Sequence, residues 1–255
     1  QDMGVMRTSL WPGLIKTLMH NQNRQQVRAR IFEMGLVFYK ENNNIEQKLK
    51  VSCLISGDAL PEQWGKQTRM ADFFDLKGDL ETLLGQAQKP ELYELQSAVH
   101  PALQPGQTAR ILRAGTAVGW LGALHPSIMQ VIDISGKVYL AELDYELVSS
   151  TEITKVTDVS RFPAVRRDLA IVLRDDIQSA EVTALIRKLG GADLQEVGIF
   201  DLYQGHNIEI GKKSLALGLT FQHPSRTLSD MDINPIIDSC INALQAEFNA
   251  ELRSS

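Results

Sequence analysis

The spacing of apolar residues changes several times from about residue 160 onward, and each change predicts the start or end of an element. Apolar runs and period-two alternation, as in Leu215, Leu217, Leu219 and Phe221, predict strands. The predicted elements are a strand Arg167–Leu173, a helix Ser179–Leu189, strands Leu194–Tyr203 and Lys212–Gln222, a helix from Ser229 to Phe248 and a short strand Ala250–Arg253. This β-α-β-β-α-β order predicts a ferredoxin-like domain with one exposed sheet face.

Polar and glycine residues support these boundaries. Ser179 is expected to cap the first helix, and Gly190-Gly191 supplies the positive φ of a helix stop. Ser229 with Asp232 three residues later resembles a capping box at the start of the second helix.

The first part of the chain also mixes helices with strands. The predicted helices are Leu10–Asn23, Ala71–Leu84 and Pro126–Ile132, and the predicted strands are Arg30–Tyr39, Lys50–Ser56, Ala109–Arg113, Val118–Leu124 and Lys137–Asp144. Turn residues join successive strands, which predicts an antiparallel sheet backed by helices. The fold class expected for the whole chain is α+β.

A polar segment rich in Ser and Thr, residues 149–158, lacks helical periodicity and is typical of a connector. It predicts two domains, residues 1–150 and 159–253.

Composition is that of an ordinary globular chain, with 44% hydrophobic and 22% charged residues among 255. No apolar run approaches the roughly 20 residues of a membrane helix, and no secretory leader precedes the first element. Because the chain begins with Gln1-Asp2, we expect a fragment of a longer polypeptide. The expected location is the cytoplasm.

Net charge argues against binding nucleic acid by bulk electrostatics. The chain carries −5, and residues 158–255 contain 10 Lys/Arg and 14 Asp/Glu, a balance of −4. An RNA-binding function would therefore depend on a local patch and on shape.

Most residues with reactive chemistry have a structural interpretation. Cys53 and Cys240 lie far apart in apolar segments, as reduced core thiols do. Gly115–Gly122 does not follow the order of a phosphate-binding loop, so turns and close strand packing explain these glycines. Asp75 and Asp79 share a helix face, which favours a solvated face or an interface over a metal site.

Two polar signals in the tail are more specific. Asp201 and Tyr203 alternate along a strand and point to the same face, and Lys212, Lys213 and Ser214 begin the next strand. A carboxylate, a phenol ring and a hydroxyl on one face suit the reading of an unpaired base. The alternative is structural, with Tyr203 capping the core and Asp201 ordering the hairpin.

Four motifs of the tail resemble a known family. They are Phe162-Pro-Ala-x-Arg-Arg-Asp168, Phe200-Asp-x-Tyr203, Gly211-Lys-Lys-Ser-Leu-Ala-Leu217 and Thr227-Leu-Ser-Asp230. They are similar to the ferredoxin-fold anticodon-binding domain at the C-terminus of the bacterial phenylalanyl-tRNA synthetase beta subunit. Met6–Leu14, Asn21–Arg24, Ile31–Gly35 and Gly119–Pro126 resemble the catalytic-like class II module of the same subunit.

The resemblance implies an α2β2 phenylalanine–tRNA ligase in which residues 1–150 pack against the catalytic alpha subunit and residues 159–253 bind the anticodon of tRNA(Phe). Ile31–Gly35 occupies the motif-2 strand without the phosphate-binding arginine of class II enzymes, although Arg28 and Arg30 are near. The fragment is therefore expected to be non-catalytic and to hold no cofactor, with ATP and magnesium used by the holoenzyme.

The family's anticodon contacts carry over to Asp201, Tyr203 and Ser214. Tyr203 is expected to stack on an anticodon base, and Asp201 and Ser214 to hydrogen-bond it. Arg166, Arg167 and Lys213 are further candidates, for phosphate contacts. Two alternatives stay open: a standalone ferredoxin-like RNA-binding or ligand-sensing module, and a purely architectural fragment of the subunit.

Overall fold

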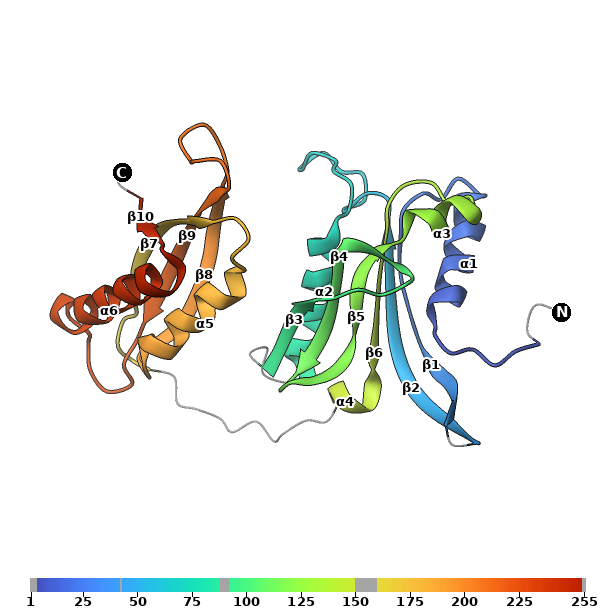
Figure 1. Cartoon of the computed structure of the whole chain (residues 1–255), viewed down its shortest axis with the longest axis horizontal. Coiled ribbons are helices and arrows are strands. Elements are labelled where there is room, and N and C mark those ends of the chain that lie inside the picture. Colours follow the sequence, from blue (N-terminus) through green and yellow to red (C-terminus); the bar gives the residue numbers. More distant parts are fainter. Residues whose placement is uncertain (1–3, 42, 88–91, 150–159, 254–255) are drawn as a thin grey trace. The chain divides into compact units, whose positions relative to one another are not determined.

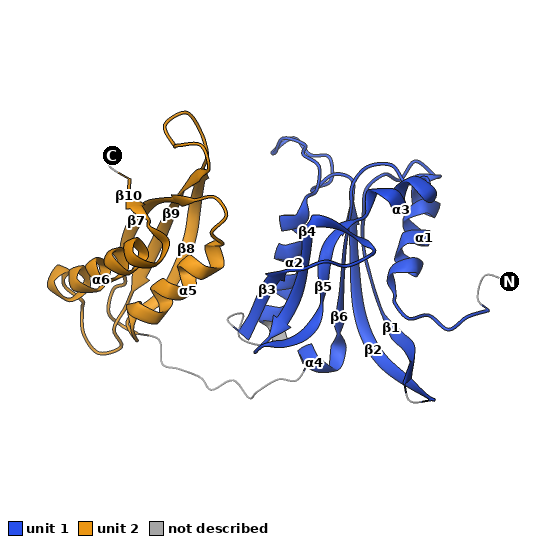
Figure 2. Cartoon of the chain, in the orientation of Figure 1, with its two compact units in different colours: residues 1–154 blue, residues 155–255 orange. Residues whose placement is uncertain are grey.

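A computed structural model describes residues 4–41, 43–87, 92–149 and 160–253. The chain divides into two compact units, unit 1 (residues 1–154) and unit 2 (residues 155–255), which are coloured separately in Figure 2. The predicted connector, residues 149–158, lies outside the described residues except for Ser149.

Unit 1 is built on an antiparallel sheet, as expected, with the order β1-β2-β6-β5-β4-β3 among the described residues (Figure 1). Its strands are β1 (Ala29–Glu41), β2 (Asn44–Ser56), β3 (Tyr93–Ser97), β4 (Leu103–Arg113), β5 (Thr116–Leu124) and β6 (Val138–Asp144). The turn between β4 and β5 has positive φ at Ala114 (46°) and Gly115 (79°), which matches the right-handed twist of a hairpin.

Helices bury both faces of this sheet. They are α1 (Trp11–Gln22), α2 (Phe73–Ala87), α3 (Pro126–Val131) and α4 (Tyr145–Ser149). Along β6, Tyr139 and Leu143 pack in the core formed with α2, whereas Val138 and Leu140 pack in the core formed with α1. Because successive side chains of a strand point to opposite faces, this one strand contributes to two separate cores.

The first turn of α1 is attached to the sheet through Glu142 on β6, whose side chain is only 8% exposed. One carboxylate oxygen of Glu142 accepts hydrogen bonds from the backbone N–H of Leu10 (2.7 Å) and from the hydroxyl of Ser9 (2.9 Å). The ammonium of Lys50 lies 3.3 Å from Glu142 and 3.3 Å from Asp144. Burial lowers the pKa of Lys50, but the two carboxylates together with Tyr39 outweigh this effect and raise it overall, so Lys50 stays charged.

The start of α2 is fixed by a reciprocal cap. Asp72 accepts a hydrogen bond from the backbone N–H of Asp75 (3.1 Å), and Asp75 accepts one from the backbone N–H of Asp72 (2.8 Å). The guanidinium of Arg69 donates two hydrogen bonds of 2.6 Å to the Asp75 carboxylate. These donors, Arg69 first, lower the pKa of Asp75 to about 2.

We expect the stability of unit 1 to decrease as the pH falls from about 4 to about 2. An aspartate of the unfolded chain has a pKa of about 3.9, whereas that of folded Asp75 is about 2. The unfolded state therefore binds the proton first, and the stabilisation by Asp75 is complete above about pH 4 and lost below it. Urea unfolding of the full chain, followed by tryptophan fluorescence, measures this because Trp11, Trp64 and Trp120 all lie in unit 1.

The matched variant for this measurement is Asp75→Asn, which keeps the size of the side chain and removes its charge. The difference in unfolding free energy between the wild type and Asp75→Asn should shrink between about pH 4 and about pH 2. A difference that stays constant over this interval would contradict the assignment.

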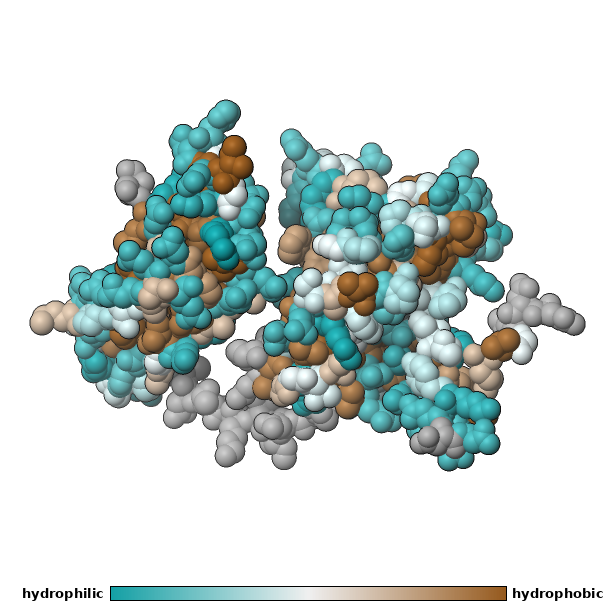
Figure 3. Space-filling view, viewed as in Figure 1, coloured by the Kyte–Doolittle hydropathy of each residue, from teal (hydrophilic) through white to brown (hydrophobic). Residues whose placement is uncertain are grey.

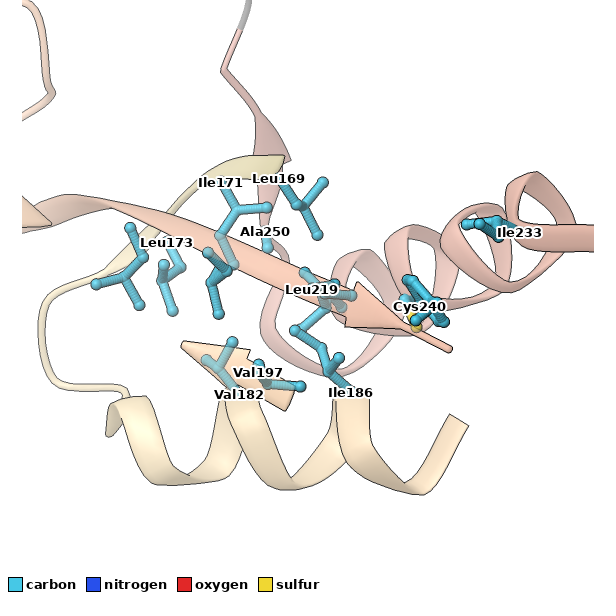
Figure 4. Packing of buried hydrophobic residues seen from close by; sticks show 14 of the residues in the cluster. Leu169, Ile171, Leu173, Val182, Ile186, Val197, Leu219, Ile233, Cys240 and Ala250 are labelled. Atoms are coloured by element: carbon cyan, nitrogen blue, oxygen red, sulfur yellow. The ribbon is translucent and has the colours of Figure 1, made fainter. Parts of the chain in front are cut away.

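Unit 2 has the predicted β-α-β-β-α-β order, with strands in the order β10-β7-β9-β8 and all neighbours antiparallel. Its elements are β7 (Val165–Arg174), α5 (Ser179–Gly190), β8 (Leu194–Tyr203), β9 (Lys212–Phe221), α6 (Asp230–Phe248) and β10 (Glu251–Leu252). Both helices contribute to a single core on one face of the sheet. Figure 4 shows Leu219 of β9 in this core together with Ile186 of α5 and Cys240 of α6. The ferredoxin-like expectation is confirmed.

Some boundaries differ from those expected. The N-cap of α5 is Gln178 instead of Ser179, and its backbone N–H donates to the carboxylate of Glu181 at 3.1 Å. Ser229 does cap α6, with its N–H donating to Asp232 at 2.8 Å. The strand β3 and the short helix α4 were not predicted.

The surface of each unit is mixed. Figure 3 shows mainly hydrophilic groups on both units, interrupted by hydrophobic patches. In the part of the chain that is described, no helix combines the length and the apolar composition needed to cross a membrane.

Candidate functional site

In the described part of unit 2, both helices pack on one face of the sheet, and we call the other face the open face. Antiparallel partners share a face, so the register identifies its members. The odd-numbered residues of β9 from Leu215 to Phe221 pack in the core with α5 and α6, and the even-numbered ones face away. The open face comprises Arg166, Asp168, Ala170, Val172 and Arg174 of β7, Lys212, Ser214, Ala216, Gly218 and Thr220 of β9, and Glu196, Gly198, Asp201 and Tyr203 of β8.

Tyr203, Ser214 and Arg253 form a cluster at one end of this face. Tyr203 and Ser214 are direct partners across β8 and β9. The guanidinium carbon of Arg253 lies 5.3 Å from the centroid of the Tyr203 ring, and Arg253 donates a long hydrogen bond of 3.4 Å to the Ser214 hydroxyl. A guanidinium over an aromatic face is attracted by the ring's quadrupole. Arg253 therefore holds both the ring and the hydroxyl in place.

The loop after β8 also positions Tyr203. A Cβ added at Gly205 would lie 2.3 Å from the Tyr203 hydroxyl, so only glycine leaves room for the phenol in its present position. The tyrosine is 37% exposed. Its ring is thus confined by the loop and by Arg253 while it remains accessible to a ligand.

Asp201 lies beside this cluster on the same face, opposite Ala216. Its side chain is exposed and, among the described residues, it takes part in no hydrogen bond or ion pair. An unpaired carboxylate beside an aromatic ring offers acceptors to a ligand that presents N–H groups. The three residues for which base contacts were expected, Asp201, Tyr203 and Ser214, are therefore brought together.

Arg166 lies at the other end of the open face. Its Nε donates to Asp168 at 2.8 Å, and its guanidinium carbon lies 5.2 Å from the centroid of the Phe200 ring. A Cβ at Gly218 would come within 2.7 Å of the Arg166 guanidinium, which shows that this group lies directly over Gly218.

Arg167 and Lys213, the other two phosphate candidates, point to the helix side of the sheet. Arg167 forms an ion pair with Asp230 in the first turn of α6. The Lys213 ammonium donates to the backbone carbonyls of Asp175 (2.9 Å) and Ile177 (2.5 Å), which closes the loop after β7. Both side chains have structural partners, and the structure does not group them with Asp201, Tyr203 and Ser214.

Basic groups on the open face are largely balanced by acids. This balance leaves little net charge with which to attract a polyanion. The ion pairs are Arg166–Asp168 (2.8 Å), Arg174–Asp176 (3.1 Å), Lys212–Glu209 (2.9 Å) and Lys212–Glu251 (3.1 Å).

Sequence reasoning missed Arg253 and the contact between Phe200 and Arg166. Arg253 is 39 positions from Ser214, and its place in the cluster depends on β10 pairing with the far side of β7. The available signal was the short final strand, which was predicted to extend over Ala250–Arg253 and so to place Arg253 at the sheet.

In unit 1 the two arginines nearest the motif-2-like strand do not fit a triphosphate site. Arg30 donates two hydrogen bonds of 2.9 Å to Asp79 and one of 3.1 Å to the carbonyl of Ala59. Arg28 donates to the carbonyls of Asp58 (3.1 Å) and Ala59 (3.4 Å). Both guanidinium groups are thus bonded to the segment that follows β2, and Arg30 also joins β1 to α2.

Both cysteines are free thiols, in different units. Burial, assisted by the charge of Asp79, raises the pKa of Cys53 to about 11, and burial raises the pKa of Cys240. Protonated thiols are poor nucleophiles and poor metal ligands. Within the described ranges, no group of three or more His, Cys, Asp or Glu side chains is arranged to hold a metal ion.

Comparison with known proteins gives two family matches. Residues 1–145 match the family described as "Phenylalanyl tRNA synthetase beta chain CLM domain", and residues 160–253 match "Ferredoxin-fold anticodon binding domain". The phenylalanine–tRNA ligase beta subunits of Pseudomonas fluorescens (strain Pf0-1) and Nitrosococcus oceani are 43% and 44% identical over 252 and 253 residues, which is 99% of this chain and 32% of each relative. The chain thus spans about a third of the length of these curated relatives.

Among solved structures, a pyrrolysyl tRNA synthetase from Desulfitobacterium hafniense matches with a TM-score of 0.40 and 13% identity. The match covers 56% of this chain and 48% of that one.

Proposed function

Because the chain belongs to the family of phenylalanyl tRNA synthetase beta chains, we propose that it is part of the beta subunit of a phenylalanine–tRNA ligase and that its open face binds the anticodon of phenylalanine tRNA. The observation that carries the proposal is the grouping of Tyr203, Ser214 and Asp201 on one sheet face, with Arg253 over the tyrosine ring.

Each side chain of this group supplies a different part of base recognition. Tyr203 stacks on an unpaired base with the ring face opposite Arg253. Asp201 accepts hydrogen bonds from N–H groups on the base edge, as the N1 and N2 positions of guanine provide. Ser214 is only 3% exposed, and its hydroxyl contributes by holding the Arg253 guanidinium beside the base. Because Arg253 and Gly205 already hold Tyr203, little side-chain freedom is lost on binding.

Affinity at this face comes from stacking and shape more than from charge. The pairing of Arg166, Arg174 and Lys212 with nearby carboxylates limits the number of phosphates that the face neutralises. The rest of the affinity for the tRNA is assigned to other parts of the enzyme.

Unit 1 is proposed to pack against a catalytic alpha subunit in an α2β2 enzyme of the cytoplasm. Its arginines Arg28 and Arg30 are occupied within the chain, so ATP and magnesium are assigned to the partner subunit. The exposed apolar side chains Phe32, Met34 and Leu36 alternate along β1 and offer a surface for such packing.

The test is aminoacylation of phenylalanine tRNA by the intact ligase carrying Tyr203→Ala. Loss of one base stack should lower kcat/KM for the tRNA by about 5- to 150-fold, equivalent to ~1–3 kcal/mol. The amino-acid activation step, measured without tRNA, should be unchanged. An unaltered kcat/KM for the tRNA in a correctly folded variant would refute the proposal.

Two variants accompany this test. Tyr145→Ala is the matched control, because Tyr145 is 38% exposed and lies in unit 1, and it should leave kcat/KM for the tRNA unchanged. Gly205→Ala keeps every functional group but forces the Tyr203 hydroxyl to move, since the added Cβ would lie 2.3 Å from it. We expect Gly205→Ala to lower kcat/KM for the tRNA with little change in thermal stability.

A further inference from the structure

A β-bulge in β8 brings two consecutive side chains to the open face. Ile199 pairs with Leu217 and Asp201 pairs with Ala216, so Phe200 has no partner in β9. A bulge of this kind redirects the extra residue away from strict alternation. Phe200 therefore does not have to point into the core, as simple alternation with Asp201 would require.

The position of Phe200 follows from its contact with Arg166. The Arg166 guanidinium lies over Gly218 on the open face, and its carbon is 5.2 Å from the centroid of the Phe200 ring. Asp168 holds the Nε of Arg166 at 2.8 Å. The ring is consequently on the same face as Asp201 and is backed by a guanidinium that is itself held in place.

Phe200 is not needed by the core. It is 55% exposed and is absent from the cluster of buried residues and from the apolar residues packed against it. Arg166 stacked on Phe200 repeats the arrangement of Arg253 stacked on Tyr203 at the other end of the face. Two cation-backed rings on one sheet face make two stacking platforms.

The two rings are far enough apart to contact different nucleotides. Phe200 and Tyr203 are three positions apart in β8, or roughly 10 Å of strand, which exceeds the ~3.4 Å between stacked bases of one strand. The open-face residues between them on β7 and β9 are Ala170 and Ala216, whose small side chains do not obstruct a chain of nucleotides.

We infer that Phe200, backed by Arg166, stacks on a second unpaired base of the same RNA whose first base is held by Tyr203. This inference rests on the proposed anticodon function. A phenyl ring has no hydrogen-bonding group, so this second contact tolerates any base and requires only that the base be unpaired. The residues around Tyr203 distinguish one base from another, whereas Phe200 binds any base that is unpaired.

The experiment measures binding of phenylalanine tRNA to the intact ligase carrying Phe200→Ala, with the wild type, Tyr203→Ala and Met231→Ala alongside. Met231 is an exposed apolar residue on α6, away from the open face, and its replacement should leave the Kd unchanged. We expect Phe200→Ala to raise the Kd about fivefold or more, and Phe200→Trp to retain the wild-type Kd. Gly218→Ala, which displaces the Arg166 guanidinium without removing it, should raise the Kd by a smaller factor.

Abasic substitutions in the anticodon loop then identify the contacted nucleotide. If Phe200 stacks on one base, Phe200→Ala has no further effect on a tRNA that lacks that base, and it keeps its full effect when the base coupled to Tyr203 is missing. An equal effect of Phe200→Ala on every abasic tRNA would overturn the inference in favour of a contact with protein. An unchanged Kd for Phe200→Ala together with a raised Kd for Tyr203→Ala would overturn the inference about Phe200 and leave the proposed anticodon function in place. Unchanged Kd values for both variants would refute the inference and the proposed function together.

Discussion

Replacing Glu142 with alanine is expected to lower the free energy of unfolding of unit 1 by about 3–5 kcal/mol. The carboxylate accepts from the Leu10 N–H at 2.7 Å and the Ser9 hydroxyl at 2.9 Å, and it lies 3.3 Å from the Lys50 ammonium. Its removal leaves a buried backbone N–H without an acceptor and a largely buried ammonium with one carboxylate, that of Asp144, in place of two. The first turn of α1 would lose its attachment to β6.

Urea unfolding of the full chain, monitored by tryptophan fluorescence, measures this loss. The control is Glu146→Ala, in which an exposed carboxylate four positions away on α4 is removed and stability should change by no more than about 0.5 kcal/mol. Glu142→Gln keeps an acceptor for Leu10 and loses the charge, and it should fall between the wild type and Glu142→Ala. If Glu142→Ala unfolds at the same urea concentration as Glu146→Ala, the anchoring role of Glu142 is wrong.

Replacing Phe221 with alanine is expected to lower the free energy of unfolding of unit 2 by about 3–5 kcal/mol. Phe221 is the largest of the fully buried side chains, and it lies at the end of β9 in the core formed with α5 and α6. Truncation removes apolar area from the core and leaves a cavity that rigid neighbours fill only in part. The effect should be confined to unit 2.

The position of the tryptophans makes this measurement specific. Trp11, Trp64 and Trp120 all lie in unit 1. Phe221→Ala should therefore shift the part of the far-UV circular dichroism transition that belongs to unit 2 and leave the tryptophan fluorescence transition, which reports unit 1, in place. Phe200→Ala is the matched control, since the same truncation at a 55% exposed ring should change stability little. Equal losses of stability in Phe221→Ala and Phe200→Ala would contradict the placement of these rings on opposite faces.

The strongly periodic elements were predictable because local pattern and tertiary packing agree there. The alternation of Leu215, Leu217 and Leu219 identifies a strand with one buried face, and β9 was found within one residue of its expected bounds. The capping pair Ser229 and Asp232 likewise depends only on neighbours in sequence.

The elements that were missed take their structure from distant partners. β3 is a five-residue strand with the sequence Tyr-Glu-Leu-Gln-Ser, and it exists because it pairs with β4 along the edge of the sheet. The N-cap of α5 was missed for a different reason: Gln178 is a residue type that is uncommon as an N-cap, and its local contact with Glu181 is made by its backbone N–H.

The candidate site was predictable in the part that lies on one hairpin. Asp201 and Tyr203 share a strand and Ser214 pairs across from Tyr203, so alternation alone places them together. Arg253 joins them through the strand order β10-β7-β9-β8, of which the predicted final strand indicated only that Arg253 lies at the sheet. Phe200 joins the open face through a bulge, which has no local signal. Arg167 and Lys213 were grouped with the site by charge, whereas their positions in the register direct them to the helix side.

The bulge also bears on how this surface evolves. With Phe200 removed, Ile199 would be followed directly by Asp201, and the pairs Ile199–Leu217 and Asp201–Ala216 would become consecutive rungs of a regular ladder. Loss or gain of a single codon at this point therefore removes or adds one aromatic platform while the core residues and the Tyr203 cluster keep their partners. Lineages can in this way change the number of RNA bases that the open face contacts without a change in the fold of the domain.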